Sequence, residues 1–221
     1  MTTCTFAHRG GVIAGVVPGT IASFQASLRA GATGVEADAW LTSDGVPVLS
    51  HRLSRRRSGR PAARDLPDEA VTLDRLYAAC GSSFQLSLDM TDAHAADVVV
   101  ACAREHGGVD NLWLTHWRLD SMRDWRQRYP GVHLVFAAMA LRGHPPRRRL
   151  ARIADAGADV FNTHHTAVSS SLVETAAQHK LAVFAWGIRR RPSMDRVLRA
   201  GVAGVYANDV AMMVEAARVQ R

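Results

Sequence analysis

The chain has 221 residues, of which 48% are hydrophobic and 21% charged, so it is long enough to bury the core of one soluble domain. No stretch approaches the ~20 apolar residues that a membrane-spanning helix needs, and three cysteines without a C-x-x-C pair argue against a disulfide framework or a thiolate zinc site. The net charge of +7 comes almost entirely from arginine, because Lys180 is the only lysine, and it favours an anionic partner.

Short apolar segments alternate with helical ones from the start of the chain. The first strand is predicted over 3–7, and a helix follows over 20–30, where the apolar residues recur at helical spacing. The next strand covers 35–41. The Asp44-Gly45 turn signal then leads into a short extra strand over 46–50.

The alternation continues to the end of the chain. Residues 52–70 are rich in Arg, Pro and Ser and indicate a loop, and helical residues follow over 73–79. The later strands are predicted over 84–89, 112–115, 132–136, 160–163, 181–186 and 205–207. The later helices are predicted near 93–105, 119–128, 147–156, 169–179, 193–200 and 210–219. Eight βα units without a linker predict a single (β/α)₈ TIM barrel over residues 1–221, with the short extra strand after its second strand.

Polar and ionisable residues collect at the expected carboxyl ends of the strands. They include His8, Arg9, Glu36, Asp38, His51, Asp89, Asn162, His164, His165, Trp186, Asn208 and Asp209. A (β/α)₈ barrel builds its active site at this end, so the distribution predicts a catalytic face.

The segment Glu36-Ala37-Asp38 places two carboxylates on one face of a strand, because residues i and i+2 point the same way. Two close carboxylates repel each other unless a cation neutralises them, and a hard divalent ion prefers oxygen ligands. The alternative is a surface strand with two solvated acids. Asp89 could add a third carboxylate, or it could cap the helix that follows it.

Two histidines stand at strand ends on either side of this carboxylate pair. An imidazole titrates near neutral pH, so His8 and His51 are candidates for proton transfer, although a lone histidine is more often structural. The chain contains no H-E-x-x-H, P-loop or G-x-S-x-G motif, which disfavours those chemistries.

These motifs occur together in one known family. The segment 7–11, Ala-His-Arg-Gly-Gly, resembles the His-Arg-Gly opening of the glycerophosphodiester phosphodiesterases, and the run 31–51 is similar to that family's second block almost position by position. The segments 184–186 and 200–208 resemble its last two strands. The resemblance implies a TIM barrel with a bound divalent metal ion, Mg²⁺ or Ca²⁺, that hydrolyses glycerophosphodiesters as a phosphoric diester hydrolase.

The resemblance also implies roles for individual residues. His8 and His51 would be the acid–base pair, and Arg9 would contact the phosphate. The metal ligands would be Glu36, Asp38 and Asp89, with Asp89 in place of the usual glutamate.

Three positions depart from the family's pattern. Its Pro-Glu-Asn-Thr segment is shortened here to 18–20, so that Gly19 stands without the acid, Arg52 replaces an aspartate, and Thr91 replaces a lysine. Arg9, Arg52 and Arg189 would hold an anionic phosphodiester at the rim, and Trp186 would give an apolar wall. The alternative is that Arg52 and Arg189 are solvated and Trp186 belongs to the core. The positive rim favours an anionic or bulky head group over choline.

The expected partner is a small phosphodiester, with a membrane-derived lipid such as a lysophospholipid as one candidate. Nucleic acid is not expected, because no basic strand with interleaved aromatic residues and no recognition helix occurs. The amino-terminal residues lack the pattern of a secretory signal, so we expect a cytoplasmic location. Two alternatives stay open: a sphingomyelinase D-like enzyme for another phosphodiester, and a non-catalytic phosphate-binding relative.

Overall fold

The computed structural model describes residues 3–51, 59–138 and 146–219. Eight parallel strands form a closed ring in the order β1-β10-β9-β8-β7-β6-β5-β2, and β1 closes it by pairing with β2. These strands are β1 (Cys4–Val12), β2 (Gly34–Leu41), β5 (Gln85–Met90), β6 (Leu112–His116), β7 (His133–Ala138), β8 (Val160–His164), β9 (Ala182–Ile188) and β10 (Gly204–Asp209). The predicted barrel is confirmed.

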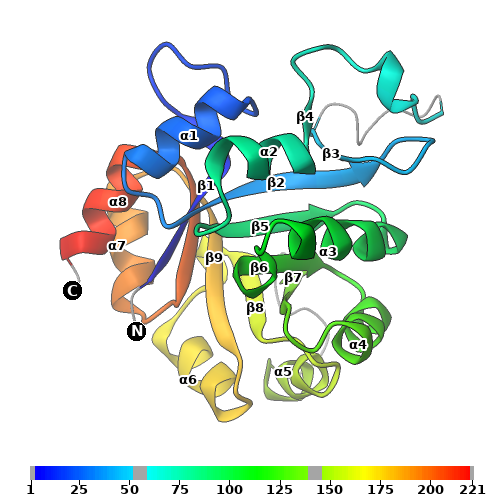
Figure 1. The fold of residues 1–221 in the computed structure, drawn as a ribbon. Helices are drawn as coiled ribbons and strands as arrows, with labels where there is room; N and C mark the ends of the chain where they lie inside the picture. Colours follow the sequence, from blue (N-terminus) through cyan, green and yellow to red (C-terminus); the bar gives the residue numbers. More distant parts are fainter. Residues whose placement is uncertain (1–2, 52–58, 139–145, 220–221) are drawn as a thin grey trace.

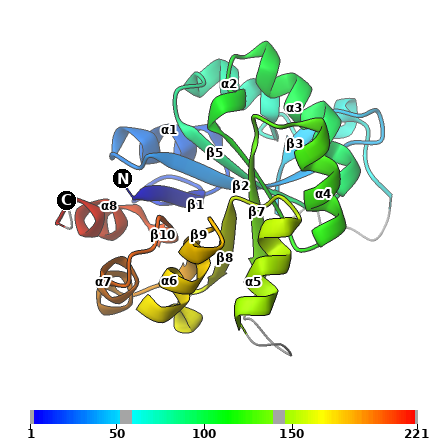
Figure 2. The same cartoon turned by 90° about the horizontal axis from the view of Figure 1, so that it is seen from below.

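Helices surround the ring of strands (Figures 1 and 2). The described residues contain α1 (Ile21–Arg29), α2 (Leu73–Cys80), α3 (Ala96–Glu105), α4 (Leu119–Arg128), α5 (Pro146–Asp155), α6 (Ser170–Gln178), α7 (Arg191–Arg199) and α8 (Val210–Val219). Because each βα unit returns the chain to the same edge, the carboxyl ends of all eight barrel strands lie on one face. No described helix is long and apolar enough to cross a bilayer.

Two short strands extend the sheet beside β2. β3 (Pro47–Leu49) pairs antiparallel with β2, as expected for the extra strand, and β4 (Val71–Thr72) pairs antiparallel with β3. β4 was not expected, because two residues are too few to show a strand pattern. Its second residue, Thr72, also begins the next helix, where its side chain accepts a hydrogen bond from the backbone N–H of Arg75.

Aromatic side chains fill the inside of the barrel below its carboxyl-terminal face. Phe6 stacks on Tyr206 with ring centroids 4.9 Å apart and contacts Phe184 at 5.8 Å. Val135 and Val160 complete this cluster. The Tyr206 hydroxyl is hydrogen-bonded to the Ser87 hydroxyl on β5 at 3.0 Å. The top of this aromatic cluster is therefore polar beside β5.

Candidate active site

Two glycines shape the end of β1 and so place His8 and Arg9. Gly10 and Gly11 have φ of +74° and +68°, and Arg9 itself has φ of +54°, a strained value for a residue with a Cβ. A Cβ on Gly10 would lie 2.3 Å from the Ser23 hydroxyl. The turn brings the backbone N–H of Arg9 to the carboxylate of Glu36, to which it donates at 3.1 Å.

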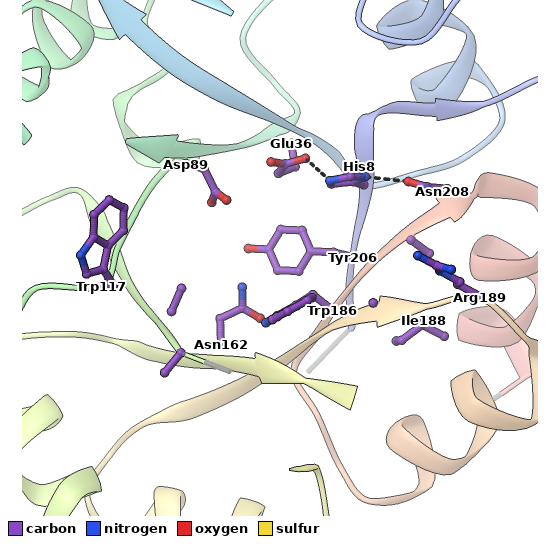
Figure 3. A pocket seen from close by; sticks show the side chains of 14 residues that line it. His8, Glu36, Asp89, Trp117, Asn162, Trp186, Ile188, Arg189, Tyr206 and Asn208 are labelled. Carbon is purple, nitrogen blue, oxygen red and sulfur yellow. Dashed lines mark hydrogen bonds and ion pairs between the residues drawn. The ribbon is translucent and has the colours of Figure 1, made fainter. Parts of the chain in front are cut away.

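A cavity of about 570 Å³ opens at this end of the barrel (Figure 3). One wall carries ionisable side chains and the facing wall is mostly apolar. Its lining consists of His8, Glu36, Asp89, Trp117, Ala137, Ala138, Asn162, Trp186, Gly187, Ile188, Arg189, Tyr206, Ala207 and Asn208.

Glu36 and Asp89 form the acidic part of the ionisable wall. Burial and the neighbouring Asp38 raise the pKa of Glu36 to about 8, against the hydrogen bond from Arg9. Burial, then Glu36, then Asp38 raise the pKa of Asp89 well above its ordinary value. Asp89 does not cap the following helix, because Asp92 accepts that hydrogen bond from the backbone N–H of His94. Two carboxylates that resist ionisation side by side are a donor set suited to a cation.

His8 lies between Asn208 and Glu36. Its Nδ1 is 2.6 Å from the amide Oδ1 of Asn208, and its Nε2 is 3.8 Å from a carboxylate oxygen of Glu36. An amide oxygen only accepts, so Nδ1 carries the proton and the lone pair is on Nε2. Burial lowers the pKa of His8, which favours this neutral form.

Asp38, Arg9 and His51 form a second cluster beside the cavity rather than in its lining. Nδ1 of His51 is 3.0 Å from the Asp38 carboxylate and 2.7 Å from a guanidinium nitrogen of Arg9. Nε of Arg9 forms an ion pair with Asp38 at 3.3 Å and makes no hydrogen bond among the described residues. Because Nδ1 cannot donate to Asp38 and accept from Arg9 at once, only one of these two contacts is a hydrogen bond in a given tautomer of His51.

The predicted metal ligands are only partly assembled. In the described chain, no group of three or more His, Cys, Asp or Glu side chains is arranged to hold a metal ion. Glu36 and Asp89 fit a divalent cation by their chemistry, because both are oxygen donors in the cavity lining and Glu36 raises the pKa of Asp89. Asp38 is instead engaged by Arg9 and His51.

The structure places some of the predicted substrate-binding residues in the cavity lining and others outside it. Trp186 and Arg189 line the cavity, and Arg189 is exposed without an ion-pair partner among the described residues. His164 supports Trp186 edge-on, with ring centroids 4.8 Å apart. Arg52 lies outside the described residues.

Among the lining residues that were not predicted as site residues, four carry an aromatic ring or a side-chain amide: Trp117, Asn162, Tyr206 and Asn208. Asn162 and Asn208 were seen at strand ends, but no motif gave them a role. The signal that could have found Asn162, Tyr206 and Asn208 is the alternation along β8 and β10, in which every second side chain faces the barrel interior.

The sequence profile of the glycerophosphoryl diester phosphodiesterase family matches residues 8–89 and 82–212. The chain belongs to this family. It is 22% identical over 247 residues to the glycerophosphodiester phosphodiesterase of Caldanaerobacter subterraneus subsp. tengcongensis, with 99% of both chains covered. As a member of the family, the protein is a phosphoric diester hydrolase.

Solved structures of glycerophosphodiester phosphodiesterases share its fold. The enzyme from Thermotoga maritima superimposes with a TM-score of 0.77 at 19% identity, covering 96% of this chain and 97% of that one. A phosphodiesterase from Oleispira antarctica, solved in complex with the product sn-glycerol-3-phosphate, gives a TM-score of 0.75 at 18% identity, covering 97% and 96%.

Two departures from the family's pattern have structural roles here. Gly19 donates its backbone N–H to the carbonyl of Arg9 at 2.8 Å, which closes the loop after β1. The Thr91 hydroxyl donates to the carbonyl of Ala39 at 2.9 Å, so it is bound to the β2 backbone. Neither position contributes a charge to the site.

Proposed function

We propose that the protein hydrolyses a glycerophosphodiester or a lysophospholipid to a phosphomonoester and an alcohol. The observation that carries this proposal is the wall of His8, Glu36 and Asp89 in the cavity at the carboxyl-terminal face of a barrel of this family. Residues 1–221 act in it as a single domain. The enzyme works in the cytoplasm on small phosphodiesters, including those derived from membrane lipids.

Glu36, Asp38 and Asp89 would hold a divalent metal ion, Mg²⁺ or Ca²⁺. Bound there, the ion would neutralise the carboxylates and polarise a phosphoryl oxygen as a Lewis acid. Asp38 forms an ion pair with Arg9 here, so it would have to give up this contact to bind the metal. The guanidinium of Arg9, once released, would bind the phosphate.

His8 and His51 perform the two proton transfers. Nε2 of His8 accepts the proton of a glycerol hydroxyl, because Nδ1 is kept protonated by Asn208. The hydroxyl oxygen forms a new bond to phosphorus, the bond to the alcohol breaks, and His51 donates a proton to the leaving oxygen. The product of this step is a cyclic phosphate. Water then opens it, and the proton transfers are reversed: His51 accepts a proton from the water and His8 returns its proton to the glycerol oxygen.

Arg189 and Trp186 bind the substrate at the mouth of the cavity, where one supplies positive charge and the other an apolar surface. Arg52 joins them in this proposal on the basis of the sequence alone.

Hydrolysis of glycerophosphodiesters and of bis-p-nitrophenyl phosphate tests the proposal, with Mg²⁺, Ca²⁺ or Mn²⁺ added to chelated protein. We expect turnover only with a metal ion, and a loss of about 10²–10⁴-fold in kcat for His8→Ala and for His51→Ala. His106→Ala is the matched control, because His106 pairs with Asp74 on the outer helices. Activity within a factor of a few in either site variant, or full activity with chelator, would refute the assignment.

A further inference from the structure

The two walls of the cavity face each other across the barrel. In the ring of eight strands, β8 lies four strands from β2, so Asn162 on β8 is opposite Glu36 on β2. By the same count β9 with Trp186 is opposite β5 with Asp89. Figure 3 shows Asp89, Glu36 and His8 along one side, Asn162, Trp186 and Ile188 along the other, and Trp117 at one end.

Asn162 is the polar exception in the apolar wall. It is only 7% exposed, and its amide Oδ1 is buried without a hydrogen-bond partner among the described residues. An amide that lacks partners costs about 1–3 kcal/mol, so a ligand group that pairs with the end of the amide facing the cavity would offset this cost. The side chain belongs to the cavity lining, and Figure 3 shows it reaching inward beside Trp186.

Small neighbours leave room in front of this amide. Ala137 is the register partner of Asn162 on β7, and Ala138 follows it in the same lining. Trp117, which is 62% exposed, borders the same space. A space between alanines and tryptophans accepts a carbon chain, and an amide in its wall binds one group that donates or accepts a hydrogen bond.

We propose that Asn162 binds a hydroxyl group of the alcohol that leaves, and that the substrates are glycerophosphodiesters of hydroxylated alcohols such as a second glycerol. This assignment rests on the proposed function. In phosphoryl transfer the attacking and leaving oxygens are roughly in line, so an attacking hydroxyl beside His8 directs the leaving alcohol toward the facing wall.

A hydroxyl suits the amide because it both donates and accepts. Either orientation of the Asn162 amide therefore finds a partner in it. A quaternary ammonium such as choline makes no hydrogen bond and would leave the amide unpaired. A propyl group fills the same space without compensating the amide.

The test compares glycerophosphoglycerol with the 1-propyl ester of glycerophosphate, which matches its carbon skeleton and lacks its two hydroxyls on the leaving side. We expect kcat/KM to favour the glycerol ester by about tenfold in the wild type. In Asn162→Leu, an apolar side chain of similar size, the ratio should fall to about one, because only the glycerol ester loses a hydrogen bond. Glycerophosphocholine should behave like the propyl ester.

A ratio near one in the wild type would overturn the proposal, as would an equal loss for both esters in Asn162→Leu. Thermal unfolding establishes that the variant is folded. If leucine is not tolerated, Asn162→Ala removes the amide without adding bulk and carries the same expectation.

Equilibrium binding separates this inference from the proposed function. Calorimetry on His8→Ala measures the affinity for both esters without turnover, and we expect about tenfold tighter binding of the glycerol ester, erased by adding Asn162→Leu. If the wild type hydrolyses neither ester but this difference is found, the proposed function fails and the hydroxyl subsite stands. Equal affinities for the two esters would refute the hydroxyl subsite, whatever the rate of hydrolysis.

Discussion

Glu36 is a carboxyl group in an environment that is unfavourable for its charge. It is buried, it lies beside other carboxylates, and its pKa is raised to about 8 in consequence. A carboxyl group in an unfolded chain has a pKa of about 4.3. The folded protein therefore binds this proton more tightly than the unfolded protein, so Glu36 in the absence of metal destabilises the fold as pH rises.

We predict that the metal-free protein loses stability between pH 7 and about 8. Over this range the unfolded state has released the Glu36 proton and the folded state has not, so the free energy of unfolding falls by up to about 1.4 kcal/mol per pH unit. The lowered pKa of His8 keeps that imidazole neutral in the folded state, and a histidine of ordinary pKa in the unfolded chain is already mostly neutral at pH 7, so His8 opposes the effect only weakly. Urea denaturation in chelator measures it.

Glu36→Gln is the matched variant, because the amide keeps the shape and cannot ionise. It should reduce the pH dependence, leaving the part that comes from Asp89, and stabilise the metal-free protein at pH 8. Added Mg²⁺ or Ca²⁺ should do the same for the wild type by favouring the ionised carboxylate. A stability that rises from pH 7 to 8 in chelator would contradict the account.

The sequence predicted the ionisable wall of the site, but of the facing wall it predicted Trp186 and not Asn162. His8, Arg9, Glu36 and His51 stand in runs whose order and spacing are distinctive, and the structure brings them together. Asn162 and Trp117 belong to no such run, since their importance comes from which strands are opposite in a closed ring. The role of each residue stays a prediction until it is measured.

The last residues of β9, where its register with β10 shifts, show how one element holds a site residue. Gly187 has φ of +78°, and a Cβ there would lie 2.6 Å from the His164 ring. That ring packs edge-on against Trp186. The position of Trp186 in the cavity therefore depends on a glycine in the next position and a histidine on the neighbouring strand.

We predict that Gly187→Ala lowers stability by about 1–2 kcal/mol through its left-handed backbone and also raises KM, because the His164 ring and Trp186 must move. Gly107→Ala is the control, since Gly107 has φ of +68° with no atom within 4 Å of a Cβ. It should lose stability without a change in KM. Thermal unfolding and steady-state kinetics provide both numbers, and equal KM values in the two variants would show that Gly187 does not position the tryptophan.

The elements themselves were largely predictable, and their ends were not. The apolar strands and helical spacings gave all eight βα units. The first strand was predicted to stop at residue 7 but continues to Val12, because two glycines allow it to bend while it stays paired near β10. Such a continuation depends on the neighbouring strand, which local sequence does not reveal.

At the scale of the whole molecule, charge sets how substrates approach. The net charge is +7, and Arg189 stands exposed at the mouth of the cavity. Attraction of an anionic diester by such a field raises the association rate and weakens with ionic strength.

We predict that kcat/KM for an anionic glycerophosphodiester falls several-fold between ~0.01 M and ~0.5 M salt, and less for zwitterionic glycerophosphocholine. Arg189→Ala should raise KM and reduce the salt dependence. Arg199→Ala removes the same charge at the far end of α7, an exposed site on the opposite face, and should do neither. A salt response that is the same in both variants would show that the net charge matters and the rim does not.

The hydrogen bond between His8 and Asn208 joins residues 200 positions apart and spans the seam where β1 meets β10. During synthesis on the ribosome, β1 emerges long before its last partner exists. Until β10 leaves the exit tunnel, the nascent sheet has two open edges that invite association with other chains. Until then His8 also lacks the partner that sets its tautomer. We therefore expect hydrolysis to begin only when the ring closes. In a refolding experiment, the time at which hydrolysis begins would report the last step of folding.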